Sequence, residues 1–280
     1  MLDALVVTPD LPADLERRDP RDTLGLPEKD EAGALLDELL EELSSLQECL
    51  YAEGRRSVLL VLQGLDASGK DGTIRRVFTG VNPQGCHVTS FKAPTPVELA
   101  HDFLWRVHAH CPARGMIGIF NRSHYEDVVT VGVLGLAPEE VWRRRPERIV
   151  EFERLLTEEG TTVLKCFLHV SAEEQRERFA ERLADPAKRW KHNPRDEETS
   201  RRFGEYVAAY DEALTATSTE GAPWYVIPAD RNWVRNFAVA KVLVEALRRL
   251  DPQFPDAPPE QKSAQFGITG DRTDARRSNT

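Results

Sequence analysis

Residues 57–72 read SVLLVLQGLDASGKDG, and this stretch decides the fold. Its first seven residues, Ser57 to Gln63, are apolar and rich in branched side chains, which is typical of a buried parallel strand. The next nine residues, Gly64 to Gly72, satisfy the pattern GxxxxGK and lead into a helical pattern. A strand, a glycine-rich turn and a helix in this order predict a loop that cradles phosphate groups.

Seven residues of this loop are predicted to bind phosphate: Gly64, Ala67, Ser68, Gly69, Lys70, Asp71 and Gly72. Glycines let the backbone approach an anion closely, and the amide groups at a helix N-terminus point toward it. Lys70 adds a mobile positive charge. The alternative is an ordinary glycine-rich turn with a lysine that faces the helix.

Two carboxylates set this loop apart from the usual pattern. Asp71 stands where a Ser or Thr hydroxyl normally contacts Mg²⁺, and Asp66 lies inside the loop. A carboxylate repels phosphate unless a cation bridges the two, so Asp66 is the first candidate ligand for Mg²⁺. Its alternative role is to cap the following turn.

Strand and helix patterns alternate along the rest of the chain. Four further apolar runs predict strands at residues 87–91, 116–120, 163–170 and 224–227. Amphipathic or charged patterns predict helices at residues 30–54, 96–110, 138–160, 173–184, 199–216 and 233–250. The alternation predicts an α/β fold with a five-stranded parallel sheet between two layers of helices, and ligands at the carboxyl ends of the strands.

The two ends of the chain differ from this body. Residues 1–30 are rich in Pro, Asp and Arg without periodicity, so we expect an extended N-terminal arm. Residues 31–251 are expected to form one domain, and residues 252–280 a disordered tail. The leucines of residues 35–50 predict a helix face that lies in the core or at a subunit contact.

A second motif follows the apolar run MIGIF at residues 116–120 and reads NRSHYED. An acid at this position would hold magnesium, but the first residue is Asn121, so Glu126 is the candidate substitute carboxylate. Arg122 is predicted to clamp a phosphate in a bidentate manner. His124 is the histidine singled out by this motif. The alternative is a polar turn that caps the next helix.

A basic segment lies between residues 176 and 202, which contains nine Lys and Arg residues and six Asp and Glu residues. We predict that residues 173–202 form a lid that closes over phosphates, with Arg178 and Arg182 on one helix face. A basic cluster with Lys188 and Lys191 follows this helix. A solvated charged helix is the alternative.

Composition excludes several classes of protein. The 280 residues carry a formal net charge of −10, and residues 1–55 hold 15 acids against 5 bases, so the rest of the chain is neutral. This balance argues against nucleic-acid binding.

The chain shows no membrane span and no secretory signal, so we expect a cytoplasmic location and no membrane partner. The four cysteines form no CxxC pair, which predicts reduced and mostly buried thiols.

Six motifs in order give the chain a resemblance to polyphosphate kinases of family 2: GLDASGKDG (64–72), FKAPT (91–95), HDFLWRVH (101–108), GIFNRSHYEDV (118–128), DPAKRWKHNPRD (185–196) and APWYVIPADRNWVRNF (222–237). The resemblance covers residues 35 to 250. It implies a thymidylate-kinase-like P-loop kinase fold with a helical lid. It also implies transfer of a phosphoryl group between inorganic polyphosphate and a nucleotide, with Mg²⁺ or Mn²⁺ as cofactor.

The resemblance also suggests roles for individual residues. Asp66, Lys70, Arg122 and Glu126 would form the catalytic set, with Asp66 on the metal and Glu126 as a second metal ligand. Polyphosphate would be held by Lys92, Arg122, His124, Arg178, Arg182, Lys188 and Lys191, together with the phosphate loop. A homo-oligomer, dimer or tetramer, is implied as well.

The second motif bears on the acceptor. Many family members have DRSWYNR where this chain has NRSHYED, which resembles the subgroup that phosphorylates both AMP and ADP. One rival is an ATP-dependent nucleoside or nucleotide kinase of the same fold, since a phosphate loop does not identify the donor. A rival of another class is a non-catalytic regulator that binds nucleotides.

Overall fold

A computed structural model describes residues 1–187, 189–191 and 195–256 of the chain. Its five strands form one parallel sheet in the order β2-β3-β1-β4-β5. The strands are β1 (Ser57–Gln63), β2 (Cys86–Ser90), β3 (Ile117–Asn121), β4 (Thr161–His169) and β5 (Trp224–Pro228). The predicted five-stranded parallel sheet is confirmed, because every strand pair is parallel and β1 lies between β3 and β4.

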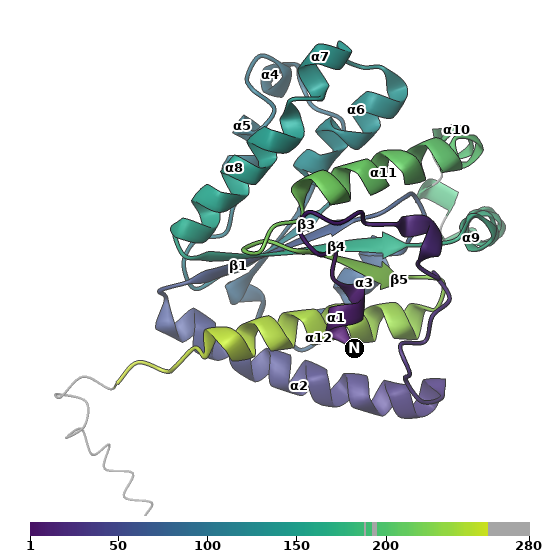
Figure 1. Ribbon diagram of the computed structural model, residues 1–280. Helices are drawn as coiled ribbons and strands as arrows, with labels where there is room; N and C mark the ends of the chain where they lie inside the picture. Colours follow the sequence, from purple (N-terminus) through teal and green to yellow (C-terminus); the bar gives the residue numbers. More distant parts are fainter. Residues whose placement is uncertain (188, 192–194, 257–280) are drawn as a thin grey trace, which may run out of the picture.

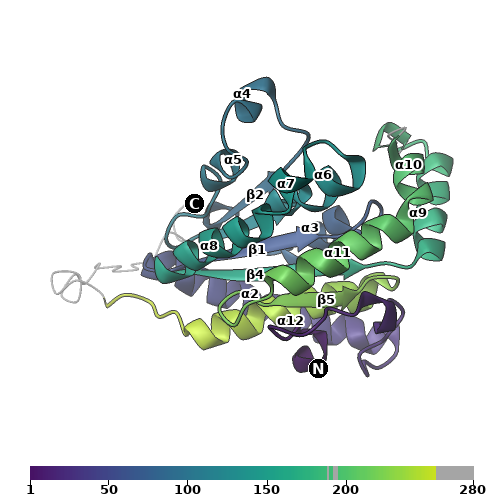
Figure 2. The same ribbon diagram turned by 45° about the horizontal axis from the view of Figure 1, so that its top comes forward.

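Two layers of helices enclose the sheet (Figure 1). One face carries α2 (Lys29–Glu53), α3 (Lys70–Val77) and α12 (Asn232–Leu250), and the other carries α8 (Arg145–Glu158) and α11 (Phe203–Thr217). At one end of the molecule, α9 (Ala172–Ala184) and α10 (Arg195–Arg201) lie side by side (Figure 2). The short elements are α1 (Leu2–Leu5), α4 (Pro96–Leu99), α5 (Trp105–His108), α6 (Val129–Leu134), α7 (Glu139–Trp142), η1 (Leu15–Arg17), η2 (Pro83–Gly85), η3 (His124–Asp127) and η4 (Arg189–Lys191).

Three of the predicted helices are divided in the structure. Residues 96–110 form α4 and α5, because Asp102 accepts a hydrogen bond from the amide of Leu104 and starts a new turn there. Residues 138–160 form α7 and α8, since Pro146 lacks the amide proton that a continuous helix needs and lies instead in the first turn of α8, which begins at Arg145. Arg202 departs from helical geometry at φ −97° and ψ 20°, which separates α10 from α11.

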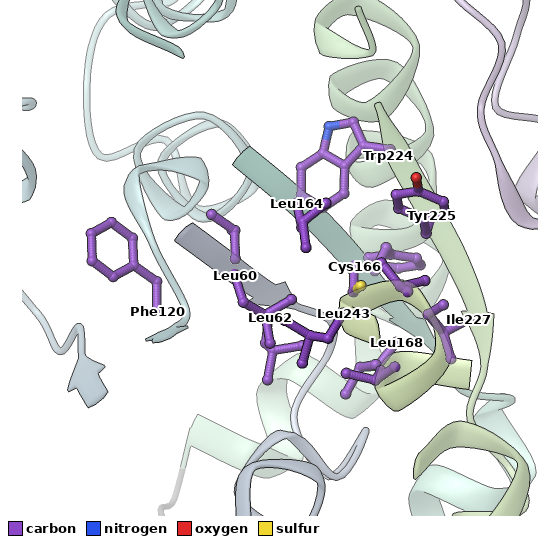
Figure 3. Close-up of a cluster of buried hydrophobic side chains, with 14 of the residues drawn as sticks. Leu60, Leu62, Phe120, Leu164, Cys166, Leu168, Trp224, Tyr225, Ile227 and Leu243 are labelled. Atoms are coloured by element: carbon purple, nitrogen blue, oxygen red, sulfur yellow. The ribbon is translucent and has the colours of Figure 1, made fainter. Parts of the chain in front are cut away.

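The core lies on both faces of the sheet. Figure 3 shows side chains of β1, β3, β4 and β5 meeting in it, with Leu243 of α12 among them. Strands β1, β3, β4 and β5 are buried, so their sequences read as nearly continuous apolar runs, whereas the edge strand β2 is partly exposed. Of the cysteines, Cys166 is buried and the other three are only partly buried, which corrects the expectation that most are buried; all four are free, as predicted.

The leucine face of α2 packs on α12 and belongs to the core. Leu36, Leu40 and Leu43 are buried in it, whereas Leu35 is 39% exposed. Of the two expected locations for this face, the core and a subunit contact, the structure shows the core, because α12 covers it. None of the helices in the described part of the chain combines the length and apolar character that crossing a membrane requires.

The N-terminal residues lie along β5. Val6 forms an antiparallel bridge with Tyr225, and the amide of Val7 donates to the carbonyl of Trp224 at 2.8 Å. The Arg18 guanidinium donates to four backbone carbonyls of the same arm, at residues 4, 5, 6 and 13. At the other end, residues 252–256 carry no regular secondary structure, and the remainder of the predicted tail, residues 257–280, lies outside the described residues.

Candidate active site

The phosphate loop joins β1 to α3 and has a backbone that only particular residues can adopt. Gly69 has φ +100°, in the left-handed region that favours glycine. At Gly64, a β-carbon would lie 2.8 Å from the carbonyl oxygen of Leu168, so only glycine fits. Ala67 also has positive φ, at 65°, which marks a strained turn. The predicted turn from strand to helix is confirmed, and α3 begins at Lys70.

Three side chains from outside the loop hold its carbonyl groups. Gln175 Nε2 donates to Asp66 O at 3.0 Å, Arg178 Nη1 to Ala67 O at 3.0 Å, and Arg235 Nη1 to Ser68 O at 3.3 Å. In a trans peptide the C=O of one residue and the N–H of the next point in opposite directions. The N–H groups of Ala67 and Gly69 therefore face away from these donors, where they can meet an anion.

Lys70 is folded back onto the loop. Its Nζ donates to Gly64 O at 2.6 Å, to Leu65 O at 3.0 Å and to Ser68 Oγ at 3.4 Å. The side chain is 8% exposed. Burial, together with the positive charge of Arg122, lowers the pKa of Lys70 to about 8. Because all three partners are neutral oxygens, a phosphate can replace them without breaking an ion pair.

Arg122 lies between the carboxylates of the two motifs. Its guanidinium forms an ion pair with Asp66 of the loop and another with Glu126 Oε2 at 3.4 Å. The neighbouring Glu126 carboxylate raises the pKa of Arg122 above its ordinary value. Arg122 has φ 62°, a rare value for a residue with a side chain, and its amide donates to Leu62 O at the end of β1. The strained turn thus places Arg122 beside the loop.

Two more contacts fix the acids of the site. Thr130 Oγ1 donates to Glu126 Oε2 at 2.6 Å, which positions this carboxylate from α6. Asn121 Nδ2 donates to Asp71 Oδ1 at 2.7 Å and so links β3 to the first turn of α3. An aspartate at position 121 could not donate this hydrogen bond, which gives the Asn in the second motif a structural reason.

The carboxylates suit a metal that is shared with substrate. In the described part of the chain, no group of three or more His, Cys, Asp or Glu side chains is placed to hold a metal ion. Mg²⁺, however, usually binds one or two carboxylates and completes its ligands with water and substrate phosphates. Asp66 and Glu126 meet around one guanidinium and supply two such carboxylates. The residues present therefore fit Mg²⁺ bound together with phosphate.

The basic segment is used differently from the prediction. Arg178 is expected to grip polyphosphate, but its guanidinium donates to Ala67 O, Ala229 O and Asp230 O and pairs with Glu174. In this arrangement the donors of Arg178 hold the protein backbone. Arg182 stacks on Phe179 at 5.3 Å and is half-buried. Lys188 and the side chain of Lys191 lie outside the described residues.

Lys92 is exposed on the loop after β2. Its backbone carbonyl accepts a hydrogen bond at 2.9 Å from Arg106 Nη1. Arg106 is itself buried, and it lies 3.7 Å from the Asp127 carboxylate. The backbone of Lys92 is thus fixed while its ammonium group can reach a ligand.

His124 does not reach the loop. The side chain is fully buried, and its Nε2 lies 3.4 Å from Glu153 Oε1. The same carboxylate accepts from Tyr125 at 2.8 Å and from Lys165 at 2.6 Å through its other oxygen. The expected contact between His124 and phosphate is therefore corrected: the histidine belongs to a buried polar network behind the second motif.

Sequence reasoning missed Arg235. This residue lies in the first turn of α12, is 3% exposed, and donates to the phosphate loop and to Thr73 Oγ1. Burial, together with the nearby Arg178, lowers its pKa to about 9. A signal existed in the motif APWYVIPADRNWVRNF at residues 222–237, which contains it, but the periodicity of α12 assigned Arg235 only to a helix.

The fold and the site together define a P-loop kinase: a parallel sheet carries a phosphate loop, a loop lysine and paired acids at the carboxyl ends of β1 and β3. Comparison with known proteins narrows this class. The model of the family described as Polyphosphate kinase 2 matches residues 27–255. The chain belongs to this family.

Individual relatives agree with the family match. The chain is 53% identical over 263 residues to the AMP/ADP-polyphosphate phosphotransferase of Meiothermus ruber, covering 94% of this chain and 98% of that protein. It is 43% identical over 240 residues to the ADP-polyphosphate phosphotransferase of Rhodopseudomonas palustris, covering 81% and 83%. The crystal structure of polyphosphate kinase 2 from Arthrobacter aurescens TC1 superposes with a TM-score of 0.87 at 41% identity, covering 91% of each chain.

Proposed function

We propose that this protein transfers a phosphoryl group from inorganic polyphosphate to AMP and to ADP, in a reversible reaction that uses Mg²⁺ or, in its place, Mn²⁺. The observation that carries the proposal is the position of Arg122 between Asp66 and Glu126, next to Lys70 and the loop amides. The 53% identity to an AMP/ADP-polyphosphate phosphotransferase supports the choice of donor and acceptors.

The residues of the site perform three tasks in this reaction. Lys70 leaves its loop carbonyls and donates to the phosphoryl group in transfer, where negative charge builds up. The loop amides hold the adjoining phosphate at the N-terminus of α3. Arg122 presents two donor nitrogens in one plane, which match two phosphate oxygens. The protein thus supplies position and charge, which is most of what phosphoryl transfer requires.

Asp66 would hold the metal, with Glu126 as a second ligand. A bound Mg²⁺ neutralises charge on the phosphates and aligns them for transfer. Asp66 is in an ion pair with Arg122 here, so the same guanidinium becomes available to phosphate when the carboxylate takes another partner.

The polymer would run over the basic surface of residues 173–202. We retain Arg182, Lys188 and Lys191 as polymer contacts, and Lys92 as a contact on the other side of the loop. Arg178 is proposed instead to fix the loop backbone through Ala67. Residues 31–251 form the phosphotransferase unit in this proposal.

Two further expectations are kept as proposals. The four free cysteines support a location in a reducing compartment, and we therefore propose that the protein is cytoplasmic. The proposal of a homo-oligomer is supported by exposed apolar residues near α4 to α7, which could form a subunit contact in place of α2. These residues are Val97, Leu99, Trp105, Leu136 and Val141. Light scattering of the purified chain measures the copy number; a monomer would remove the second expectation.

A donor comparison tests the proposed function. Purified protein with Mg²⁺ is incubated with AMP or with ADP, and either polyphosphate or ATP serves as the donor. ADP and ATP formed from AMP with polyphosphate support the proposal, whereas ATP formed from ADP alone would remove AMP as an acceptor. Transfer from ATP only would favour the rival nucleotide kinase, and no transfer from either donor would favour the rival regulator.

A further inference from the structure

Arg235 lies directly behind the phosphate loop. A β-carbon placed on Gly69 would lie 2.0 Å from Arg235 Nη1, and one on Gly72 would lie 3.5 Å from Nη2. The guanidinium therefore rests against the backbone at the N-terminus of α3, on the side opposite to the one the loop amides face. Gly69 is needed here for its positive φ and also to leave room for this side chain.

Arg235 forms no ion pair with an acidic side chain in the described part of the chain. Its four hydrogen-bond acceptors are neutral: Thr73 Oγ1 at 2.7 Å, Asn232 Oδ1 at 2.6 Å, Asn236 Oδ1 at 3.2 Å and Ser68 O at 3.3 Å. A buried guanidinium is costly to desolvate, and proteins usually pair it with a carboxylate. An unpaired one needs another source of negative charge.

A second guanidinium adds to the same positive region. Arg178 Nη2 lies 3.4 Å from Asn232 Oδ1, so both arginines approach one amide oxygen. Glu174 pairs with Arg178 at 2.7 Å and also acts on Arg235 from beyond ion-pair distance, so one carboxylate serves two guanidinium groups and one positive charge is left over. The charge of Arg235 remains, close to the loop peptide between Ser68 and Gly69.

We propose that Arg235 is a positioning residue for the phosphate donor. It fixes the peptide between Ser68 and Gly69 so that the Gly69 amide faces the anion, and its unpaired charge draws phosphate to the front of the loop. The phosphate supplies the counter-ion that Arg235 lacks at ion-pair distance among the described residues. This inference rests on the proposed function, in which polyphosphate occupies the loop.

Two substitutions separate charge from hydrogen bonding. Arg235→Lys keeps the positive charge but loses the planar fork, whereas Arg235→Gln keeps a donor and loses the charge. If the charge attracts phosphate, the lysine variant binds nearly as well as the wild type and the glutamine variant does not. If Arg235 only supports the fold, both variants lose stability and neither changes affinity in this order.

The experiment titrates tripolyphosphate into the full chain by calorimetry and also measures KM and kcat for polyphosphate. We expect Arg235→Gln to raise the dissociation constant and KM at least about tenfold, and Arg235→Lys about threefold or less. Since Arg235 does not touch the reacting atoms, kcat at saturation changes by about twofold or less. Arg249→Gln, which removes an exposed charge from the far end of α12, serves as the control and should match the wild type.

A third variant keeps the test decisive even if Arg235→Gln does not fold. Asn232→Asp places a carboxylate against the guanidinium without changing the shape of the side chain, and it should weaken tripolyphosphate binding while leaving the melting temperature equal or higher. Asn82→Asp makes the same charge change at the cap of η2, beyond the far end of α3, and should leave binding unchanged.

Tripolyphosphate binding to Arg235→Gln or Asn232→Asp within twofold of the wild type would overturn the inference. A glutamine variant that binds better than the lysine variant would do the same. If the wild type itself neither binds tripolyphosphate nor phosphorylates AMP or ADP from polyphosphate, the proposed function fails as well, so the two failures are distinguishable.

Discussion

Lys70 and Lys165 are both buried lysines next to one of the two motifs, but they have different partners. Among the described residues, the hydrogen-bond partners of Lys70 Nζ are all neutral oxygens of its own loop. Lys165 Nζ pairs with the Glu153 carboxylate at 2.6 Å and also donates to Thr217 O and Tyr125 OH. Burial lowers the pKa of both lysines, and for Lys165 the Glu153 carboxylate opposes this effect.

The different partners indicate different roles: Lys70 is available to bind phosphate, whereas Lys165 stabilises the fold. The ammonium of Lys165 is neutralised inside the protein, where it connects β4 to α8 and to the second motif. The ammonium of Lys70 is exchangeable, because loop carbonyls are weaker partners for a cation than phosphate oxygens are. The same contrast holds between Lys165 and Arg235. Among the described residues, the buried cations Lys70 and Arg235 form no ion pair and lie at the phosphate loop, whereas Lys165 has a carboxylate partner and lies behind the second motif.

Removing the exchangeable lysine should have the largest effect. Lys70→Ala is expected to lower kcat for ADP formation by about a thousandfold, because the transferring phosphoryl group loses its charged donor. Thermal unfolding should change little, since the neutral partners of Lys70 remain satisfied locally or by water. Steady-state assays and a melting curve measure both. Retained activity would contradict the role of Lys70.

Removing the architectural lysine should affect stability. Lys165→Met leaves Glu153 buried beside Tyr125 and His124 without its cation, and we expect a loss of about 3–5 kcal/mol in the free energy of unfolding. Urea denaturation measures it. Lys241→Met, which breaks the partly exposed pair with Glu245, should cost about 1 kcal/mol or less. Equal losses in the two variants would show that the buried pair contributes no more to stability than the partly exposed one.

Replacing Glu126 should affect the two acceptors, AMP and ADP, to different extents. ADP can offer two phosphates to a metal, whereas AMP offers one and depends more on a protein carboxylate. Glu126→Gln should therefore reduce kcat/KM for AMP about tenfold more than for ADP. Thr130→Val, which removes only the hydroxyl that positions Glu126, should show a weaker form of the same preference. Equal losses with AMP and ADP would refute a differential role.

A pH profile is expected to show the smallest effect. The pKa of Lys70 is lowered to about 8, so the free enzyme loses this positive charge as the pH rises through 8. The value of kcat/KM for polyphosphate should then fall by up to about tenfold per pH unit above 8, whereas kcat at saturation falls less because bound phosphate stabilises the ammonium. In Lys70→Arg the fall should disappear, since arginine stays protonated. An unchanged slope in this variant would assign the titration to another group.

Short sequence patterns were sufficient to predict the sheet and the phosphate loop. The run at residues 57–63 coincides with β1, and the glycines at 64 and 69 occupy backbone positions that only glycine fits. The division of residues 138–160 was readable from Pro146 but was concealed by a continuous amphipathic pattern. Fold class and catalytic loop therefore follow from short stretches of sequence.

Long-range contacts explain what the sequence could not provide. Arg235 meets Ser68 and Thr73 across more than 160 residues, and no local pattern encodes that approach. His124 stands in a motif next to Arg122, yet a contact with Glu153, 29 residues away, draws it into the core. The lid pattern and the family resemblance place Arg178 on the polymer, whereas in the structure it donates to backbone carbonyls of distant turns.

The most direct test of the central claim follows phosphorus itself. Polyphosphate, AMP, Mg²⁺ and the protein are mixed without ATP, and ³¹P NMR spectra are recorded over time. The account predicts that the phosphorus lost from the polymer equals the phosphorus gained in the β-phosphate of ADP and then in the γ-phosphate of ATP. An unchanged polymer signal, or its conversion to orthophosphate with AMP intact, would contradict it.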